Sequence, residues 1–273
     1  MEMDIDIEVN ENQISFDFLN EQKETQSLQQ AENYDWVADE TLVVLIKAKE
    51  GFSYDFQICG KSMLDWVSMA TSCCQQKTIE ESAEEALLPR LAEICEGYEY
   101  VAVFYSDTPL LKKSTFLEVM THFSKRKMNV LKLKRGFVFK TSYLKTAKMM
   151  LSTSIEDFGK DDFCVVNDAR KMSYAFNVLN NRIVEYHKQQ GVVFFGESFV
   201  DADVEIEEGA IIYPNNVIKG QSYIGKEVIL ESGNFILDTI VCDRAYVCQS
   251  YLEKSKIEKG KSVIFQKLIS EKV

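Results

Sequence analysis

Aliphatic side chains recur at every sixth position through the last third of this 273-residue chain. Seven of them keep the interval strictly: Val200, Ile206, Ile212, Ile218, Ile224, Leu230 and Ile236. The spacing continues, with slips, at Val241, Val247, Leu252, Ile257 and Val263. A six-residue period is typical of a parallel β-helix, in which each inward side chain stacks on its equivalents in the neighbouring coils. We therefore expect a β-helix over residues 196–273.

The residues before the repeats alternate between strand-like and helix-like segments. Residues 41–48 (TLVVLIKA) and 101–105 (VAVFY) have the composition of buried strands. Helices are expected after Ser62, which stands three residues before Asp65 as in a capping box, and over 114–127. Alternation of strands with helices predicts a doubly wound α/β sheet.

Three further segments extend this pattern. Residues 79–96 are expected to be helical, with Pro89 kinking the helix or dividing it in two. Residues 136–144 (GFVFKTSYL) are strand-like. A long helix is expected over roughly 169–190, with Asp168 as its N-cap. This helix would connect the α/β domain to the repeats.

The first 35 residues differ from the rest in charge. They hold ten acidic side chains and one lysine, so most of the net charge of −12 lies there. Residues 3–9 and 14–19 alternate apolar with polar or acidic residues, which predicts a β-hairpin with one apolar face. A lone hairpin is marginally stable in water, so it would pack on its own chain or on a partner protein. The expected organisation is an acidic appendage with a linker (1–35), a reduced α/β domain (36–168), a connecting helix (169–195) and the β-helix (196–273).

The composition excludes several classes of function. An acidic chain lacks the broad basic surface that binds nucleic acid or an anionic membrane. No apolar run approaches the ~18 residues of a membrane span, and there is no signal-peptide pattern. The seven cysteines form no C-x-x-C pair and have no histidine nearby. Free thiols in a cytoplasmic protein are therefore expected, rather than a metal site or a disulfide framework.

The segment VAVFYSDTPLL (101–111) places Asp107 directly after a buried strand. Ligands of open α/β sheets bind beyond the carboxyl ends of the strands, and a carboxylate there can hold Mg²⁺ against a phosphate. An ordinary Asp-Thr-Pro turn explains the same residues. From this segment alone the turn is the favoured interpretation, and the metal-ligand interpretation remains open.

A doubly wound domain joined by a long helix to hexapeptide repeats resembles the bacterial N-acetylglucosamine-1-phosphate uridyltransferase family. The segments that carry the resemblance are ICGKSMLDWV (58–67), FYSDTPLL (104–111), VVNDARKM (165–172) and repeats such as DADVEIEEGAIIYPNNVIKG (201–220). The resemblance is close from about 160 to 265, patchy over 41–145 and absent from 1–35. It implies a nucleotidyltransferase-like first domain and a left-handed, trimer-forming β-helix.

The resemblance also implies a magnesium site. In the family, the aspartate of the strand end and the asparagine of the V-N-D segment together hold the Mg²⁺ that bridges the nucleotide phosphates. These residues correspond to Asp107 and Asn167 here. The resemblance thus favours a metal-ligand origin for Asp107 over the turn interpretation.

Other parts of the family's site are missing. The glycine-rich loop after the first strand is absent, and the family's lysine before C-G-K falls on Ser53. Lys134 stands where the family's sugar-binding asparagine would be, and Gly136 is the part of that motif that remains. Of the family's uracil-reading segment, at most Gln75 and Gln76 remain. Losing one charge-stabilising donor costs on the order of 10²–10³ in rate. We therefore assign no catalytic residue, and keep Gln76 and Gly136 as substrate-binding candidates.

Two functions are compatible with these features. The favoured one is a divergent relative with lost or much reduced catalysis, acting as a trimeric scaffold or as a regulatory partner of an active enzyme. The alternative is an active Mg²⁺-dependent uridyltransferase that makes UDP-N-acetylglucosamine from UTP and N-acetylglucosamine 1-phosphate. Acetyl transfer is not expected, because both histidines, His122 and His187, precede the repeats. The expected partners are two further copies of the chain, a protein at the acidic hairpin, and a nucleotide sugar.

Overall fold

The computed structural model describes residues 37–146, 155–156, 158–159 and 161–273. The expected acidic hairpin and its linker lie outside these residues. Within the described parts, no helix has both the length and the apolar character needed to cross a bilayer.

A six-stranded sheet forms the first half of the molecule, in the order β4-β1-β5-β7-β6-β8. Its strands are β1 (Thr41–Lys47), β4 (Gln75–Glu80), β5 (Tyr100–Tyr105), β6 (Val130–Leu133), β7 (Gly136–Lys140) and β8 (Ile155–Glu156). The central strand β1 pairs parallel with β4 and β5, whereas β7 runs antiparallel to β5 and β6. The sheet is therefore mixed, with its most buried strands in the middle.

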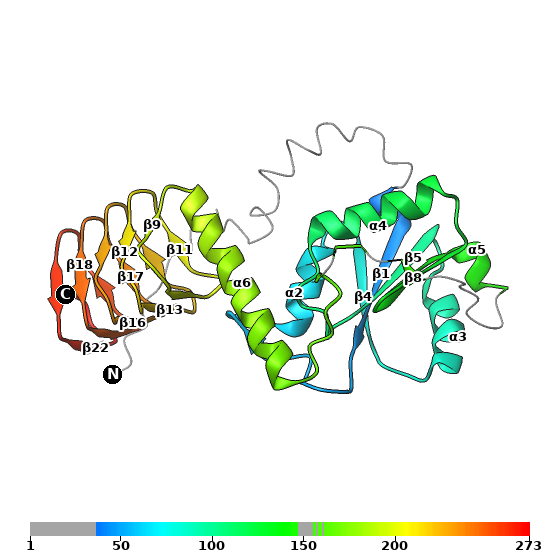
Figure 1. Cartoon of the computed structure of the whole chain (residues 1–273), viewed down its shortest axis with the longest axis horizontal. Helices are drawn as coiled ribbons and strands as arrows, with labels where there is room; N and C mark the ends of the chain where they lie inside the picture. Colours follow the sequence, from blue (N-terminus) through cyan, green and yellow to red (C-terminus); the bar gives the residue numbers. More distant parts are fainter. Residues whose placement is uncertain (1–36, 147–154, 157, 160) are drawn as a thin grey trace.

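Helices cover both faces of this sheet (Figure 1). They are α2 (Met63–Ala70), α3 (Glu84–Ile94), α4 (Lys113–Lys125) and α5 (Thr141–Leu144), preceded by a 3-10 turn, η1 (Ala38–Glu40). Alternate residues of β1 point to opposite faces: Val43 and Leu45 pack in the cluster with α2 and α4, while Val44 packs with α3 and α5. This three-layer arrangement confirms the α/β class that the strand and helix alternation predicts.

The helix boundaries predicted from the sequence are confirmed in part. Ser62 and Asp65 form the predicted capping box at the start of α2. The helix predicted over 79–96 is shorter, because Ile79 and Glu80 belong to β4 and α3 begins at Glu84. Pro89 lies inside α3 without dividing it. The strand-like run 136–144 ends at Lys140 and continues as α5.

The last third is a β-helix of short parallel strands in three sheets (Figure 1). The first sheet contains β9 (Val193–Phe194), β12 (Ile211–Ile212), β15 (Ile229–Leu230), β18 (Tyr246–Cys248) and β21 (Ser262–Ile264). The second contains β10 (Phe199–Val200), β13 (Val217–Lys219), β16 (Phe235–Leu237), β19 (Tyr251–Glu253) and β22 (Lys267–Ile269). The third contains β11 (Glu205–Ile206), β14 (Tyr223–Ile224), β17 (Ile240–Val241) and β20 (Lys256–Ile257). The predicted repeat architecture is confirmed.

The aliphatic side chains that recur every six residues fill the interior of this β-helix. All twelve aliphatic residues singled out from the sequence are buried, with at most 7% of their surface exposed. The slips shorten the coils: Phe199, Val217 and Phe235 pair at intervals of 18 residues, whereas Tyr251 and Lys267 follow at intervals of 16. Since inward side chains still meet their equivalents, the shortening is absorbed at the corners between strands.

The long helix α6 (Ala169–Gln189) lies between the sheet and the β-helix (Figure 1). Asp168 caps it as predicted, accepting a hydrogen bond from the Lys171 amide at 2.8 Å. A short hairpin, β2 (Gln57–Ile58) and β3 (Lys61–Ser62), reaches the first coil, where the Ala202 amide donates to the Cys59 carbonyl at 2.9 Å. One hydrophobic cluster runs from this hairpin through α6 into the repeats, so the two halves share a core.

Candidate functional site

The carboxyl ends of four strands meet at one edge of the sheet. β4, β1 and β5 are parallel, and β6 shares their direction because it and β5 both pair antiparallel with β7. Ligands of open α/β sheets bind outside this edge. The residues that follow these strands and interact there are Ala48, Lys49, Glu81, Ser106, Asp107 and Arg135.

Asp107 forms an ion pair with Arg135 at this edge. Nε of Arg135 donates to Oδ1 of Asp107 at 3.1 Å and to Oδ2 at 3.0 Å, and Nη2 lies 2.7 Å from Oδ2. The carboxylate is 3% exposed. Burial raises the pKa of the Asp107 carboxyl, and the hydrogen bonds and charge of Arg135 oppose that shift. Both carboxylate oxygens are therefore engaged by one internal cation.

Two further groups hold the Arg135 guanidinium in place. Its Nη2 donates to Oε1 of Glu81 at 3.2 Å, so the guanidinium bridges two carboxylates. Its central carbon lies 3.8 Å from the centroid of the Tyr105 ring, within cation–π range. The arginine side chain is thus fixed by contacts from β5 and from the end of β4.

The backbone after β1 is also tied to neighbouring side chains. The Ala48 amide donates to Oγ of Ser106 at 3.0 Å, and the Lys49 amide donates to Oε2 of Glu81 at 2.8 Å. Such amides at the end of a first strand are the donors that cradle phosphates in nucleotide-binding loops. Here they are already paired within the chain.

Asn167 lies on a segment that runs beside Asp107. The Val166 amide donates to the Asp107 carbonyl at 2.8 Å, which brings the V-N-D segment to the strand end. Gly51 approaches from the loop after β1 so closely that a Cβ there would lie 2.7 Å from Cα of Asn167. Oδ1 of Asn167 accepts a hydrogen bond from Nζ of Lys171 at 2.8 Å. The structure therefore brings the two predicted metal-ligating residues into neighbouring segments.

The side-chain oxygens of Asp107 and Asn167 are not arranged to bind a magnesium ion, because both side chains are paired with cations. Mg²⁺ binds carboxylate and amide oxygens, yet those of Asp107 and Asn167 accept from the cations Arg135 and Lys171. Among the described residues, no group of three or more His, Cys, Asp or Glu side chains is placed to hold a metal. The magnesium assignment stays a prediction from the resemblance, without support from these contacts.

The two substrate-binding candidates, Gln76 and Gly136, both make contacts that stabilise the fold. Gln76 is near the start of β4, five residues before Glu81 and so about 16 Å from the carboxyl edge. Its side chain donates to the Ser68 carbonyl at 2.7 Å and accepts from the Ser68 hydroxyl at 2.7 Å, which ties β4 to α2. Gly136 begins β7 with φ of +148°, and a Cβ there would lie 2.5 Å from the Val103 carbonyl oxygen. Glycine is thus required for the pairing of β7 with β5.

Arg135 and Glu81 are not among the site residues predicted from the sequence. The motif there pointed to the neighbouring Lys134, which is exposed. Residues 79–81 were predicted to be helical, whereas β4 runs to Glu80 and brings Glu81 to this edge. Recognising β4 and β6 as strands would have placed both charged residues just after strand ends, whereas their position beside Asp107 depends on the strand order of the sheet.

Comparison with known proteins identifies relatives of part of the chain. The bifunctional protein GlmU of Streptococcus gordonii is 33% identical over 112 residues, which cover 40% of this chain and 24% of that protein. GlmU of Streptococcus suis is 36% identical over 111 residues, with coverage of 40% and 24%. GlmU of Streptococcus agalactiae is 32% identical over 123 residues, with coverage of 44% and 26%. The chain is a partial and divergent relative of the GlmU proteins, which confirms the resemblance stated from its motifs.

The extent of these matches is limited. The matched part of the chain spans about a quarter of the length of the curated relatives. No family model matches the chain. Among solved structures, 4-diphosphocytidyl-2C-methyl-D-erythritol synthase of Anaerococcus prevotii aligns with a TM-score of 0.40 and 8% identity, covering 52% of this chain and 99% of that one.

Proposed function

We propose that this chain is a non-catalytic member of a sugar-nucleotidyltransferase lineage, acting as a trimeric scaffold or as a regulatory partner of an active enzyme. The observation that carries the proposal is the pairing of the amides after β1. The Ala48 amide is bound by Ser106, and the Lys49 amide by Glu81. A nucleoside triphosphate would have to displace both acceptors.

The chemistry of nucleotidyl transfer explains why this pairing matters. Because the protein supplies positioning and positive charge rather than covalent chemistry, donors must face the triphosphate. Here the carboxylate of Glu81 lies against the Lys49 amide and would repel a phosphate in that position. Lys47 is paired as well: its Nζ lies 3.1 Å from Glu80 and 4.5 Å from the centroid of the Tyr54 ring. Two backbone amides and Lys47 at this edge are therefore already paired within the chain.

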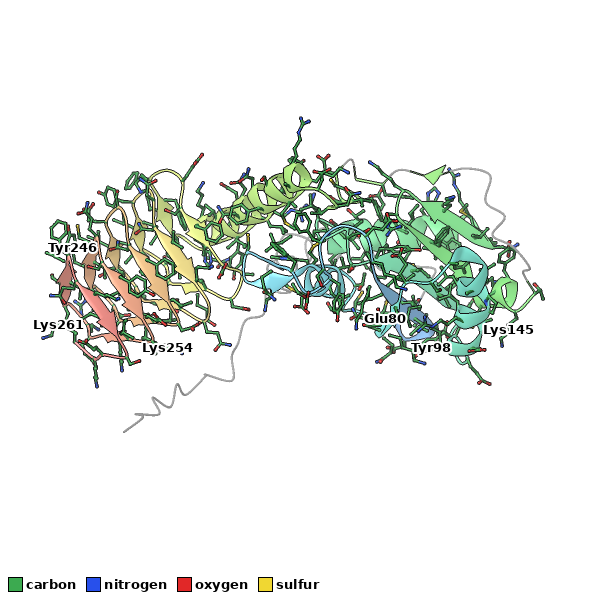
Figure 2. The ribbon with its side chains drawn as sticks, turned by 90° about the horizontal axis from the view of Figure 1, so that it is seen from below. Glu80, Tyr98, Lys145, Tyr246, Lys254 and Lys261 are labelled. Carbon is green, nitrogen blue, oxygen red and sulfur yellow. The ribbon has the colours of Figure 1, made fainter. Side chains whose placement is uncertain are left out.

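The outer faces of the β-helix support a role in assembly. One sheet presents an outward row of half-buried apolar side chains, Val217, Phe235 and Tyr251. In the first coil the same position is held by Phe199, which α6 covers by stacking Phe176 on it. Another sheet presents Ile211, Ile229 and Tyr246, the last labelled on the β-helix in Figure 2. The rings of Phe235 and Tyr251 stack with centroids 5.0 Å apart. Flat apolar faces of this kind favour association of identical chains about a symmetry axis.

The catalytic half of the proposal is tested by pyrophosphate release from UTP and N-acetylglucosamine 1-phosphate with Mg²⁺. We expect no release above background, and no calorimetric heat from UDP-N-acetylglucosamine at millimolar concentration. Release that is abolished by Asp107→Ala would establish the alternative, an active uridyltransferase.

The assembly half is tested by analytical ultracentrifugation. We expect trimers for the wild type, and dissociation to monomers for Phe235→Glu, because a charge buried in a contact between copies is costly. Lys254→Glu, at an exposed corner of the same β-helix, is the matched control and should remain trimeric. A monomeric wild type would refute the trimer. For the acidic appendage, we propose a protein partner, and deletion of residues 1–34 should weaken that complex.

A further inference from the structure

We propose that the Arg135 guanidinium is a built-in substitute for a divalent cation at Asp107, and that its removal opens a latent metal site between Asp107 and Glu81. The inference deepens the proposed function and rests on it, because a magnesium-dependent enzyme would need Asp107 free to bind its metal.

The contacts of Arg135 are those expected of a cation that bridges carboxylates. Its Nε contacts both oxygens of Asp107, and its Nη2 lies 2.7 Å from Asp107 and 3.2 Å from Glu81. A hard divalent cation can likewise be held by two carboxylates, with water completing its shell. One guanidinium thus occupies the position between the two carboxylates.

The Arg135 guanidinium keeps its positive charge and its place beside Asp107 under ordinary conditions. Arginine stays protonated across the accessible pH range, and its planar group matches a carboxylate with two hydrogen bonds. Because the Tyr105 ring packs 3.8 Å from the guanidinium carbon, the side chain is also held from a third direction. A metal ion at millimolar concentration would have to displace all of these contacts.

Removing the arginine side chain would leave an accessible acidic pair. The side chains of Arg135 and Glu81 are 28% and 23% exposed, whereas that of Asp107 is 3% exposed. Solvent therefore reaches the site from the Arg135 side, and a hydrated cation could follow the same route. The unpaired, largely buried Asp107 carboxylate would favour such a cation, since an uncompensated buried charge is costly.

The test uses Mn²⁺ as the probe, measured by electron paramagnetic resonance and by thermal unfolding of the full-length chain. We expect Arg135→Ala to bind one Mn²⁺ with a Kd at or below about 1 mM, and to unfold at a higher temperature as Mn²⁺ is added. Wild type and Lys134→Ala should bind at least tenfold more weakly. Lys134→Ala is the matched control, because it removes the same charge from the same turn but leaves the Asp107 pair intact.

A second set of variants locates the metal. The double variant Arg135→Ala/Asp107→Asn should lose the bound Mn²⁺. Arg135→Gln, which keeps much of the side-chain volume, replaces Arg135→Ala if the latter fails to fold. The proposal is overturned if a folded Arg135 variant binds no Mn²⁺, if the bound Mn²⁺ persists in the double variant, or if the wild type binds Mn²⁺ through Asp107. None of these outcomes depends on nucleotide turnover, so failure here is distinct from failure of the proposed function.

Discussion

The buried histidine of α6 provides a quantitative test of the packing around the last turn of that helix. His187 lies in the last turn of α6 and is 3% exposed. Within the described structure, its Nδ1 has no hydrogen-bond partner. Burial lowers the pKa of His187 from 6.5 to about 4. The imidazole is therefore neutral in the folded protein at pH values where the unfolded chain is protonated.

The sign of the effect follows from proton linkage. Between about pH 6.5 and pH 4 the unfolded chain binds the proton more readily, so acidification shifts the equilibrium toward unfolding. With His187 pKa values of 6.5 unfolded and about 4 folded, the free energy of unfolding falls by about 2 kcal/mol from neutral pH to about pH 5. The loss reaches about 3 kcal/mol near pH 4.

The assay is urea unfolding of wild type, His187→Leu and His187→Gln at several pH values. We expect both variants to lose less stability than the wild type on acidification, by about 2 kcal/mol at about pH 5. His187→Leu removes the unpaired nitrogen, whereas His187→Gln keeps a polar group, so agreement between them assigns the effect to titration. A difference between wild type and variants that changes by less than about 0.5 kcal/mol over this range would refute the reasoning.

Two further substitutions test the parts of the fold that frame the site and the repeats. Gly136→Ala places a Cβ 2.5 Å from the Val103 carbonyl oxygen at positive φ. We expect the free energy of unfolding to fall by about 2 kcal/mol or more, which a lower thermal midpoint would show. An unchanged midpoint would contradict the close approach of β7 to β5. Asn234 is 2% exposed, and its Oδ1 accepts from the Ser250 amide at 2.9 Å. Asn234→Ala should cost about 1–3 kcal/mol and speed hydrogen exchange at the Ser250 amide, and slow exchange in the variant would show that this bond is dispensable.

The repeats were determined by the sequence alone. Stacked coils place equivalent residues in equivalent environments, so the interior side chains must recur at the spacing of the strands. The slips after Ile236 were visible as well, and all of the residues involved are buried. Capping is similarly local: Ser62 with Asp65, and Asp168 with the Lys171 amide, lie three residues apart and depend only on the start of their own helices.

The set of charged residues at the carboxyl edge of the sheet was determined by the tertiary structure. β4 is a polar strand in which only Ile79 is buried, so no apolar alternation marks it in the sequence. Arg135 is 28 residues from Asp107 and 54 from Glu81, and no local pattern relates the three. They meet because backbone pairing aligns the carboxyl ends of β4, β5 and β6. The sequence could place an aspartate at the end of a buried strand, but only the folded sheet determined that its cation is an arginine of the same chain.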